Sequence, residues 1–124
     1  MAKSVHNDVL DGALNVIKSN CDRMTASSAE PTTFAEGNST YALADAAMAA
    51  GDFTVADGDT SGRKITTGQK SGVTVDASGT ATHVALLDTV GSRLLYVTTC
   101  TSQALTAGNS MTFEAWDIEI ADPS

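Results

Sequence analysis

The sequence predicts a mainly β protein: a β-sandwich of jelly-roll type with one N-terminal α-helix, in a single domain of residues 1–124. Apolar residues recur at helical spacing in residues 4–19. Short runs of Thr, Val, Leu and Tyr fill residues 61–120, with Gly-bearing turns between them, as is typical of sandwiches. Residues 20–60 show a mixed and irregular pattern. A chain of 124 residues is long enough to bury one hydrophobic core.

The predicted helix is SVHNDVLDGALNVIKS, residues 4–19. Ser4 suits the N-cap, and Asn20 suits the left-handed conformation that often ends a helix. Gly12 weakens the helix interior by up to about 1 kcal/mol, so the helix needs a packing surface on the domain's own sheet or on a partner chain. Its predicted apolar stripe consists of Val9, Leu10, Ala13, Leu14, Val16 and Ile17.

Residues 20–60 give weaker signals. The segment CDRMTAS, residues 21–27, is a strand candidate, and a polar stretch follows it. YALADAAMAAGDF, residues 41–53, is rich in alanine but lacks helical periodicity. Because small side chains bury little area, we predict that this segment is mostly irregular, with at most a helical turn.

Residues 61–120 alternate between strand runs and turns. Two β-rich runs flank GQKSG, residues 68–72, which we predict to be a hairpin loop. DTVGSR, residues 88–93, supplies turn chemistry between the two strongest strand runs, and LTAGNS, residues 105–110, turns the chain again. The step Ala115–Trp116 breaks the alternation of apolar and polar residues, which indicates a bulge or a change of face.

Composition excludes several classes of function. The net charge of −8 and the pI near 4.3 disfavour nucleic acid and anionic lipid as partners, because phosphate contacts need Lys and Arg. The sequence contains no apolar run long enough for a membrane span, and its first residues do not resemble a leader, so we expect folding in a cytoplasm. Cys21 and Cys100 stand far apart, outside any metal-binding spacing, and are expected to be reduced core thiols.

One segment begins like a calcium loop. Asp57, Asp59 and Ser61 occupy the first, third and fifth positions of an EF-hand, and Gly62 occupies the sixth. The twelfth position should be a bidentate Glu but is Gly68, and strand patterns, not helices, follow the loop. The sequence therefore predicts a polar turn without a metal site.

No set of residues indicates catalysis, and we expect a protein that is not an enzyme and has no cofactor. His6 and His83 each lack a second metal ligand at local spacing. A triad of His83, Asp88 and a serine lacks the elbow motif that presents a nucleophile. Asp117 and Glu119 share one face of a strand, but a glycosidase needs a cleft lined with aromatic residues.

Tyr96 and Trp116 are too few and too separated in the sequence to suggest such a cleft. A solvated strand face is the simpler interpretation of the two carboxylates. Together with Phe113, the two aromatic residues are expected to lie in the core.

The chain resembles head decoration (cement) proteins of tailed bacteriophages and related small virion components. The resemblance is carried by THVALLD at 82–88 and by RLLYVTTCTSQALTAGNSMTFEAWDIEIADPS at 93–124, together with MAKSVHNDVLDGAL, EPTTF, YALAD and GDF earlier in the chain. It implies a sandwich or jelly roll on the outer surface of the capsid, assembled in the host cytoplasm. It also implies a homo-oligomer, with a trimer favoured, that binds the major capsid protein and stabilises the shell.

Two alternatives remain at this point. One is a tail or head-fibre module that binds other tail proteins or the host surface. The other is a small carbohydrate-binding domain, which the scarcity of aromatic residues disfavours. If the protein binds a shell, contacts are expected from the N-terminal helix and from residues 30–55.

Overall fold

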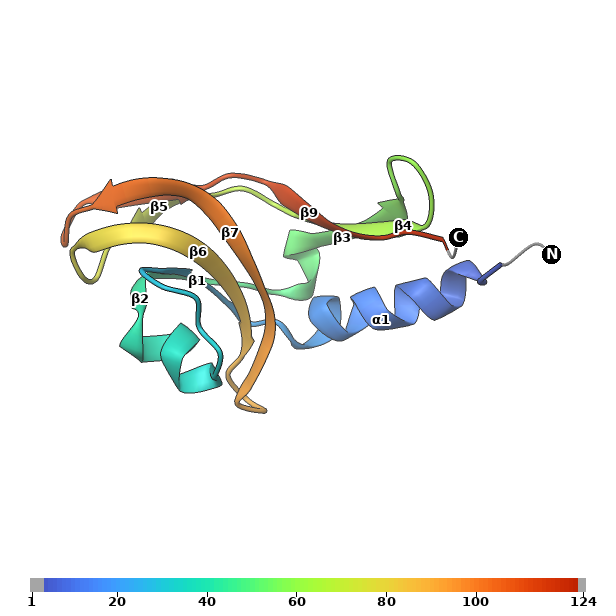
Figure 1. The fold of residues 1–124 in the computed structure, drawn as a ribbon, viewed down its shortest axis with the longest axis horizontal. Helices are drawn as coiled ribbons and strands as arrows, with labels where there is room; N and C mark the ends of the chain where they lie inside the picture. The colour runs from blue at the N-terminus through green and yellow to red at the C-terminus, as the bar shows by residue number, and fades with distance from the viewer. Residues whose placement is uncertain (1–3, 123–124) are drawn as a thin grey trace.

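The computed structural model describes residues 4–122 and shows a mainly β fold with one N-terminal helix, as predicted (Figure 1). All strand pairs in this part of the chain are antiparallel. In chain order the elements are α1 (Asn7–Asn20), β1 (Arg23–Ser27), η1 (Glu36–Thr40), β2 (Ala42–Ala47), η2 (Ala50–Asp52), β3 (Phe53–Asp57), β4 (Arg63–Thr67), β5 (Lys70–Thr74), β6 (Gly79–Asp88), β7 (Arg93–Leu105), β8 (Ser110–Phe113) and β9 (Trp116–Ile120).

The elements form two regions that lie end to end (Figure 1). In the first region, the sheet β2-β1-β6-β7 and the pair β5-β8 make the layers of a sandwich. In the second, the sheet β3-β4-β9 lies against α1. One continuous core joins the regions. It contains Met24 and Leu86 in the sandwich, and Leu14 of the helix with Phe53 and Ile65 in the second region.

The helix begins and ends differently from the sequence prediction. His6, not Ser4, is the N-cap: its Nδ1 accepts a hydrogen bond of 3.0 Å from the Asp8 N–H. At the other end, Asn20 is the last helical residue, and Cys21 follows in extended conformation at φ −70°. Asn20 therefore does not adopt a left-handed conformation; its side-chain amide instead donates to the Val16 carbonyl at 2.8 Å.

Polar contacts fix α1 to the three-stranded sheet. Arg63 on β4 donates from Nε to the Asp11 carboxylate at 2.8 Å, and both side chains are mostly buried. Lys18 donates from Nζ to the carbonyl of Phe53 at 2.7 Å and to that of Ala50 at 3.1 Å. Because these bonds lie near opposite ends of the helix, they set its direction along the sheet.

The β6–β7 hairpin agrees with the prediction from DTVGSR. The Asp88 carboxylate caps the turn by accepting from the backbone N–H groups of Val90 at 3.1 Å and Gly91 at 3.0 Å. Its other oxygen accepts from Arg93 Nε and Nη2 at 3.0 and 2.9 Å. Ser92 takes a positive φ of 56° in this turn.

The expectation of a mostly irregular segment at 41–53 was wrong for Ala42–Ala47, which forms the regular strand β2, whereas the helical turn considered there is present as η2. β2 pairs along β1, where Ala46 lies opposite Met24 and Ala44 lies opposite Ala26. Alanine has a low intrinsic preference for strands. Here Leu43, Ala44 and Ala46 are buried in the core, so tertiary packing outweighs that preference. Residues 20–60 thus contain three strands.

The predicted hairpin at 68–72 was also wrong. β4 pairs with β3 and β9, whereas β5 pairs with β8, so Gly68 and Gln69 carry the chain from one sheet to another. The break in alternation at Ala115–Trp116 has a similar origin, since the chain there passes from β8 to β9 in a different sheet.

Candidate functional site

The sandwich is almost closed into a barrel. The order β7-β6-β1-β2 continues to β5 through a bridge between Ala44 and Val75, and the carbonyl of Leu43 accepts from the N–H of Asp76 at 2.7 Å. β5 then pairs with β8. In residues 4–122 no strand ladder joins β8 back to β7, so one seam remains open.

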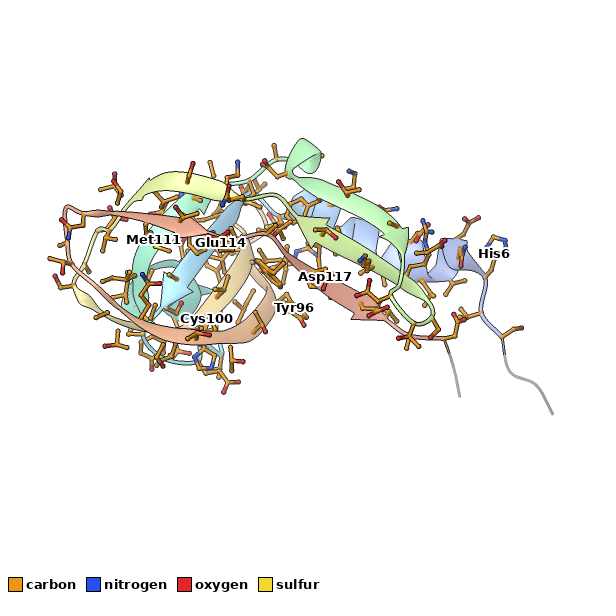
Figure 2. The ribbon with its side chains drawn as sticks, turned by 90° about the horizontal axis from the view of Figure 1, so that it is seen from above. His6, Tyr96, Cys100, Met111, Glu114 and Asp117 are labelled. Carbon is orange, nitrogen blue, oxygen red and sulfur yellow. The ribbon has the colours of Figure 1, made fainter. Side chains whose placement is uncertain are left out.

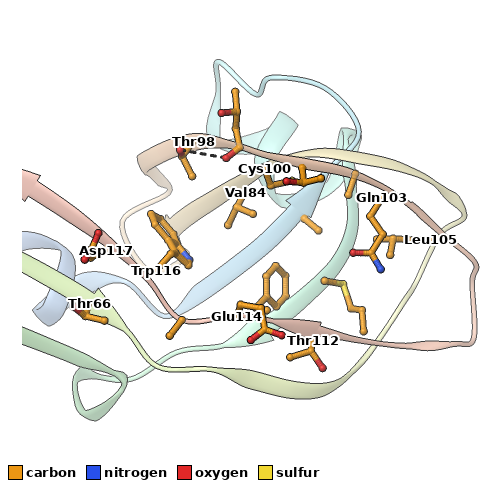
Figure 3. Close-up of a pocket in the computed structure, with 17 residues that line it drawn as sticks. Thr66, Val84, Thr98, Cys100, Gln103, Leu105, Thr112, Glu114, Trp116 and Asp117 are labelled. Atoms are coloured by element: carbon orange, nitrogen blue, oxygen red, sulfur yellow. Dashed lines mark hydrogen bonds between the residues drawn. The ribbon is translucent and has the colours of Figure 1, made fainter.

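A cavity of about 700 Å³ lies at this seam (Figure 3). β7 lines it with residues 98–101, 103 and 105, and the chain from β8 to β9 lines it with residues 111–117. The consecutive lining residues of β7 include a bulge at 100–102, and β7 is the last strand of its sheet, so the cavity lies along a sheet edge. We call this cavity, with these lining residues, the seam cleft.

The β7 edge of the cleft has one of the usual protections, a bulge at residues 100–102 opposite Thr82, but it has no charge and no covering strand. Residues 94–105 contain no charged residue, no Pro and no Gly. Natural proteins commonly shield an edge strand with Lys, Pro, a bulge or a covering segment, because its free N–H and C=O groups pair readily with another chain. The side chains of residues 101–104 are exposed, and no strand in the described part of the chain covers this edge.

An aromatic pair stands at one end of the cleft. The rings of Tyr96 on β7 and Trp116 on β9 stack, with centroids 5.9 Å apart and planes inclined by 29°. The fold thus brings together two rings that are distant in the sequence, although one stacked pair does not make the aromatic-lined cleft that a glycosidase needs. Both are half-buried against the core, whereas Phe113 lies in it as predicted. Trp116 Nε1 is buried and has no acceptor among residues 4–122.

The rim of the cleft is acidic. Glu114 and Asp117 line it, and no Lys or Arg does. Glu114 accepts a hydrogen bond from the neutral Gln69 amide at 3.0 Å. Asp117 lies 3.5 Å from Lys64 Nζ, which is closer, at 2.7 Å, to Asp59. One lysine thus serves two carboxylates, and the rim keeps a net negative charge.

The calcium-like segment is the turn between β3 and β4. Asp57 pairs with Arg63 and Asp59 with Lys64, each at 2.7 Å. The hydrogen bond to Asp59 is the main reason why the pKa of Lys64 is raised. The turn closes with a bond of 2.9 Å from the Gly58 N–H to the Gly62 carbonyl. Within residues 4–122, no group of three or more His, Cys, Asp or Glu side chains is arranged to hold a metal ion.

The residues considered for catalysis do not converge. His6 is exposed at the start of α1, far from the cleft residues labelled in Figure 2. His83 lies in β6 beside the Thr82 hydroxyl at 2.9 Å, five residues from Asp88 along the same strand, which places their Cα atoms about 17 Å apart. Asp117 and Glu119 are exposed on β9, in agreement with a solvated strand face.

The two cysteines differ. Cys21 is buried at the junction of α1 and β1, and burial raises the pKa of its thiol to about 11. Cys100 is half-buried in the cleft wall, not in the core as expected, and burial raises its pKa as well. Both are free thiols.

A second unpartnered surface lies on α1. Leu10, Leu14 and Ile17 are buried against the domain, as part of the predicted stripe. The remainder of that stripe is turned to solvent: 64% of Val9 and 43% of Val16 are exposed. We call this surface, made of Val9, Gly12, Ala13 and Val16, the outer helix face.

Comparison with known proteins shows no match to a family model, to a curated protein or to a solved structure. The described residues also contain no helix with the length and hydropathy that a membrane crossing requires. Sequence reasoning missed the seam cleft. The one local feature of the sequence that indicates this cleft is the charge-free run of residues 94–105, and such a run is equally typical of a buried strand.

Proposed function

We propose that this chain is a non-enzymatic structural protein of a tailed-phage virion, a head decoration protein that binds the major capsid protein and stabilises the shell. The observation that supports it is the pair of unpartnered surfaces: the outer helix face in one region of the molecule and the seam cleft in the other. A cement protein that acts as a homo-oligomer needs two such surfaces, one for copies of itself and one for the shell.

In this proposal the outer helix faces meet around a symmetry axis and form a homo-oligomer, most simply a trimer. The oligomer then binds several shell subunits at once on the outer capsid surface, after assembly in the host cytoplasm. Multivalent binding multiplies modest single affinities, because the second and third contacts form within one complex. The clamp holds together joints that the pressure of packaged DNA pulls apart.

The experiment compares phage particles assembled with and without the protein. Electron microscopy of the intact particles should show the protein as density on the outside of the shell. On heating, particles without it should release DNA at a lower temperature. Equal robustness of both preparations, with no density on the shell, would contradict the proposal and favour a tail or head-fibre module that binds tail proteins or the host surface.

The carbohydrate-binding alternative gains little from the aromatic pair. A sugar platform needs an open ring face, whereas Tyr96 and Trp116 are half-buried and cover one face of each other.

A further inference from the structure

We propose that the seam cleft receives one extended segment of a partner protein, which pairs with the free edge of β7 as an added strand. That the partner is the shell subunit rests on the function proposed above. The location and chemistry of the site rest on the strand order, the edge and the charges.

Strand order shows what is missing. Around the sandwich the strands follow the order β7-β6-β1-β2-β5-β8, with a single bridge joining β2 to the end of β5. In residues 4–122, only the junction of β8 with β7 has neither a ladder nor a bridge. The cleft follows β7 from Thr98 to Leu105, which pair with Val84 and Gly79 on either side of the bulge, a length of about 17 Å. That length suits a single strand of ordinary size. An inserted strand would give its N–H and C=O groups to β7 and complete the wall.

The chemistry of the β7 edge supports pairing by backbone. Its wall carries threonine and other uncharged side chains, so it does not select strongly by charge and does not repel a β-prone segment. Trp116 adds a second indication. A buried indole N–H without an acceptor is unfavourable, so an incoming carbonyl that accepts from Trp116 Nε1 would strengthen binding.

The acidic rim specifies the occupant further. Glu114 and Asp117 stand on the wall opposite β7, where no Lys or Arg balances them within the cleft. We therefore assign the cleft to a β-prone segment that carries a Lys or Arg next to its uncharged residues.

A second copy of this chain fits less well. Its own β7 edge, residues 94–105, brings no cation to the acidic rim. β7 also arches over the sandwich, with the chain from β8 to β9 on the far side of the cleft (Figures 1 and 3). A single extended segment fits between these walls, whereas an edge strand still attached to a folded domain would meet the opposite wall.

The test uses Cys100 as a natural reporter. The free protein and protein bound to purified shells are treated with iodoacetamide at pH 8.5, and alkylation of each cysteine is followed by mass spectrometry. Cys100 should react at least about tenfold more slowly in the bound protein, as expected for a paired strand edge. Cys21 is buried and should stay unmodified in both samples, which confirms that the chain remains folded.

Two variants with the same charge change complete the test. Thr101→Lys places a charge on the β7 edge inside the cleft and should weaken shell binding at least about tenfold, or about 1.4 kcal/mol. Ser71→Lys lies on the exposed surface of β5, outside the cleft, and should change binding less than about twofold. Thermal midpoints of both variants show whether either change disturbs the fold.

The outcomes separate the two proposals. If the protein binds shells but Cys100 stays as reactive as in the free chain, and Thr101→Lys binds normally, the cleft assignment is wrong and the decoration function stands. If the wild-type chain does not bind shells at all, both are wrong. If Thr101→Lys fails to fold, the alkylation rate of Cys100 in the free and bound native chain decides alone whether the cleft is occupied.

Discussion

Gly62 determines the shape of the β3–β4 turn. Its φ is +72°, and a Cβ at this position would overlap the backbone carbonyl of Ile120. Gly62→Ala should destabilise the protein by about 2–4 kcal/mol, the sum of left-handed strain and of overpacking. Thermal unfolding measures the effect. Gly12→Ala is the control: a Cβ there meets nothing within 4 Å, so this change should stabilise the helix by about 0.5–1 kcal/mol. Equal midpoints for the two variants would contradict this account.

Asp88 should make stability fall in acid. The N–H of Gly91, followed by Arg93, lowers the pKa of this carboxyl below its usual value. Its contribution is therefore complete above about pH 4 and is lost as the pH falls through the folded-state pKa. Asp88→Asn should lower the midpoint at pH 7, with a difference that shrinks below about pH 4. Glu30→Gln, which removes the same charge at an exposed site, serves as the control for the change in net charge.

The contribution of Asp45 to stability should change with pH in the opposite direction to that of Asp88. Partial burial, followed by the neighbouring Asp76 carboxyl, raises the pKa of Asp45. A raised folded-state pKa means that the contribution of Asp45 is fully favourable below about pH 4 and is lost as the pH rises through that pKa. Asp45→Asn should therefore raise the midpoint at pH 7, and the gain should fade in acid. A gain that is constant from pH 3 to 7 would show that the cause is not ionisation.

At the scale of elements, the β3–β4 hairpin has the spacing of a calcium loop but carries its own cations. Calcium would have to displace Arg63 from Asp57 and Lys64 from Asp59 without the twelfth-position carboxylate. Millimolar calcium should therefore leave the midpoint of the wild-type chain unchanged and give no saturable heat in calorimetry. Asp59→Ala is the matched variant, and its midpoint should respond to calcium no more than that of the wild type.

Substitutions on the two faces of α1 should have different effects on folding stability. Leu14 is 1% exposed, so Leu14→Ala should cost about 2–5 kcal/mol of folding free energy. Val16→Ser, on the outer helix face, should change stability by less than about 0.5 kcal/mol. Chemical denaturation measures both. The same contrast rules out deletion of residues 1–20 as a clean test of binding, because that deletion removes part of the core.

The elements that could be predicted are those fixed by local chemistry. The helix is periodic over its own length, and the β6–β7 hairpin contains its Asp, Gly and Ser within six residues. The predictions for β2 and for the passage from β4 to β5 were wrong because the geometry of both depends on distant partners. β2 pairs with β1, and β5 pairs with β8. The predicted ends of the helix were wrong because His6, an uncommon capping residue, is the N-cap, and because Cys21 after the helix is extended and no left-handed residue ends it.

At the scale of the whole molecule, the candidate site is a property of topology. Residues 94–105 look alike in sequence whether the strand lies inside a sheet or at its edge. Only the sheet order places β7 at an edge and brings the chain from β8 to β9 opposite it. The stacking of Tyr96 on Trp116 has the same origin, since twenty residues of chain separate two rings that the fold brings to 5.9 Å. Composition did indicate that the surface is acidic, and the rim of the cleft agrees with this.

The outer helix face gives the last prediction, which concerns self-association. A helix of 14 residues is about 21 Å long, so a pair of such faces buries too little for a stable dimer alone. Around a threefold axis, however, each helix touches two neighbours, and the three contacts form together. The wild-type chain should therefore sediment at three times its monomer mass of 12.7 kDa at high concentration.

The double variant Val9→Ser and Val16→Ser should sediment as a monomer and keep the wild-type midpoint for unfolding of the isolated subunit. Because each chain carries a net charge of −8, added salt should strengthen the wild-type oligomer by screening the repulsion between subunits. Ser71→Lys, which lies on β5 away from the helix, is the control and should still associate. If the double variant and the wild type have the same mass at every concentration, the outer helix face is not the contact between copies.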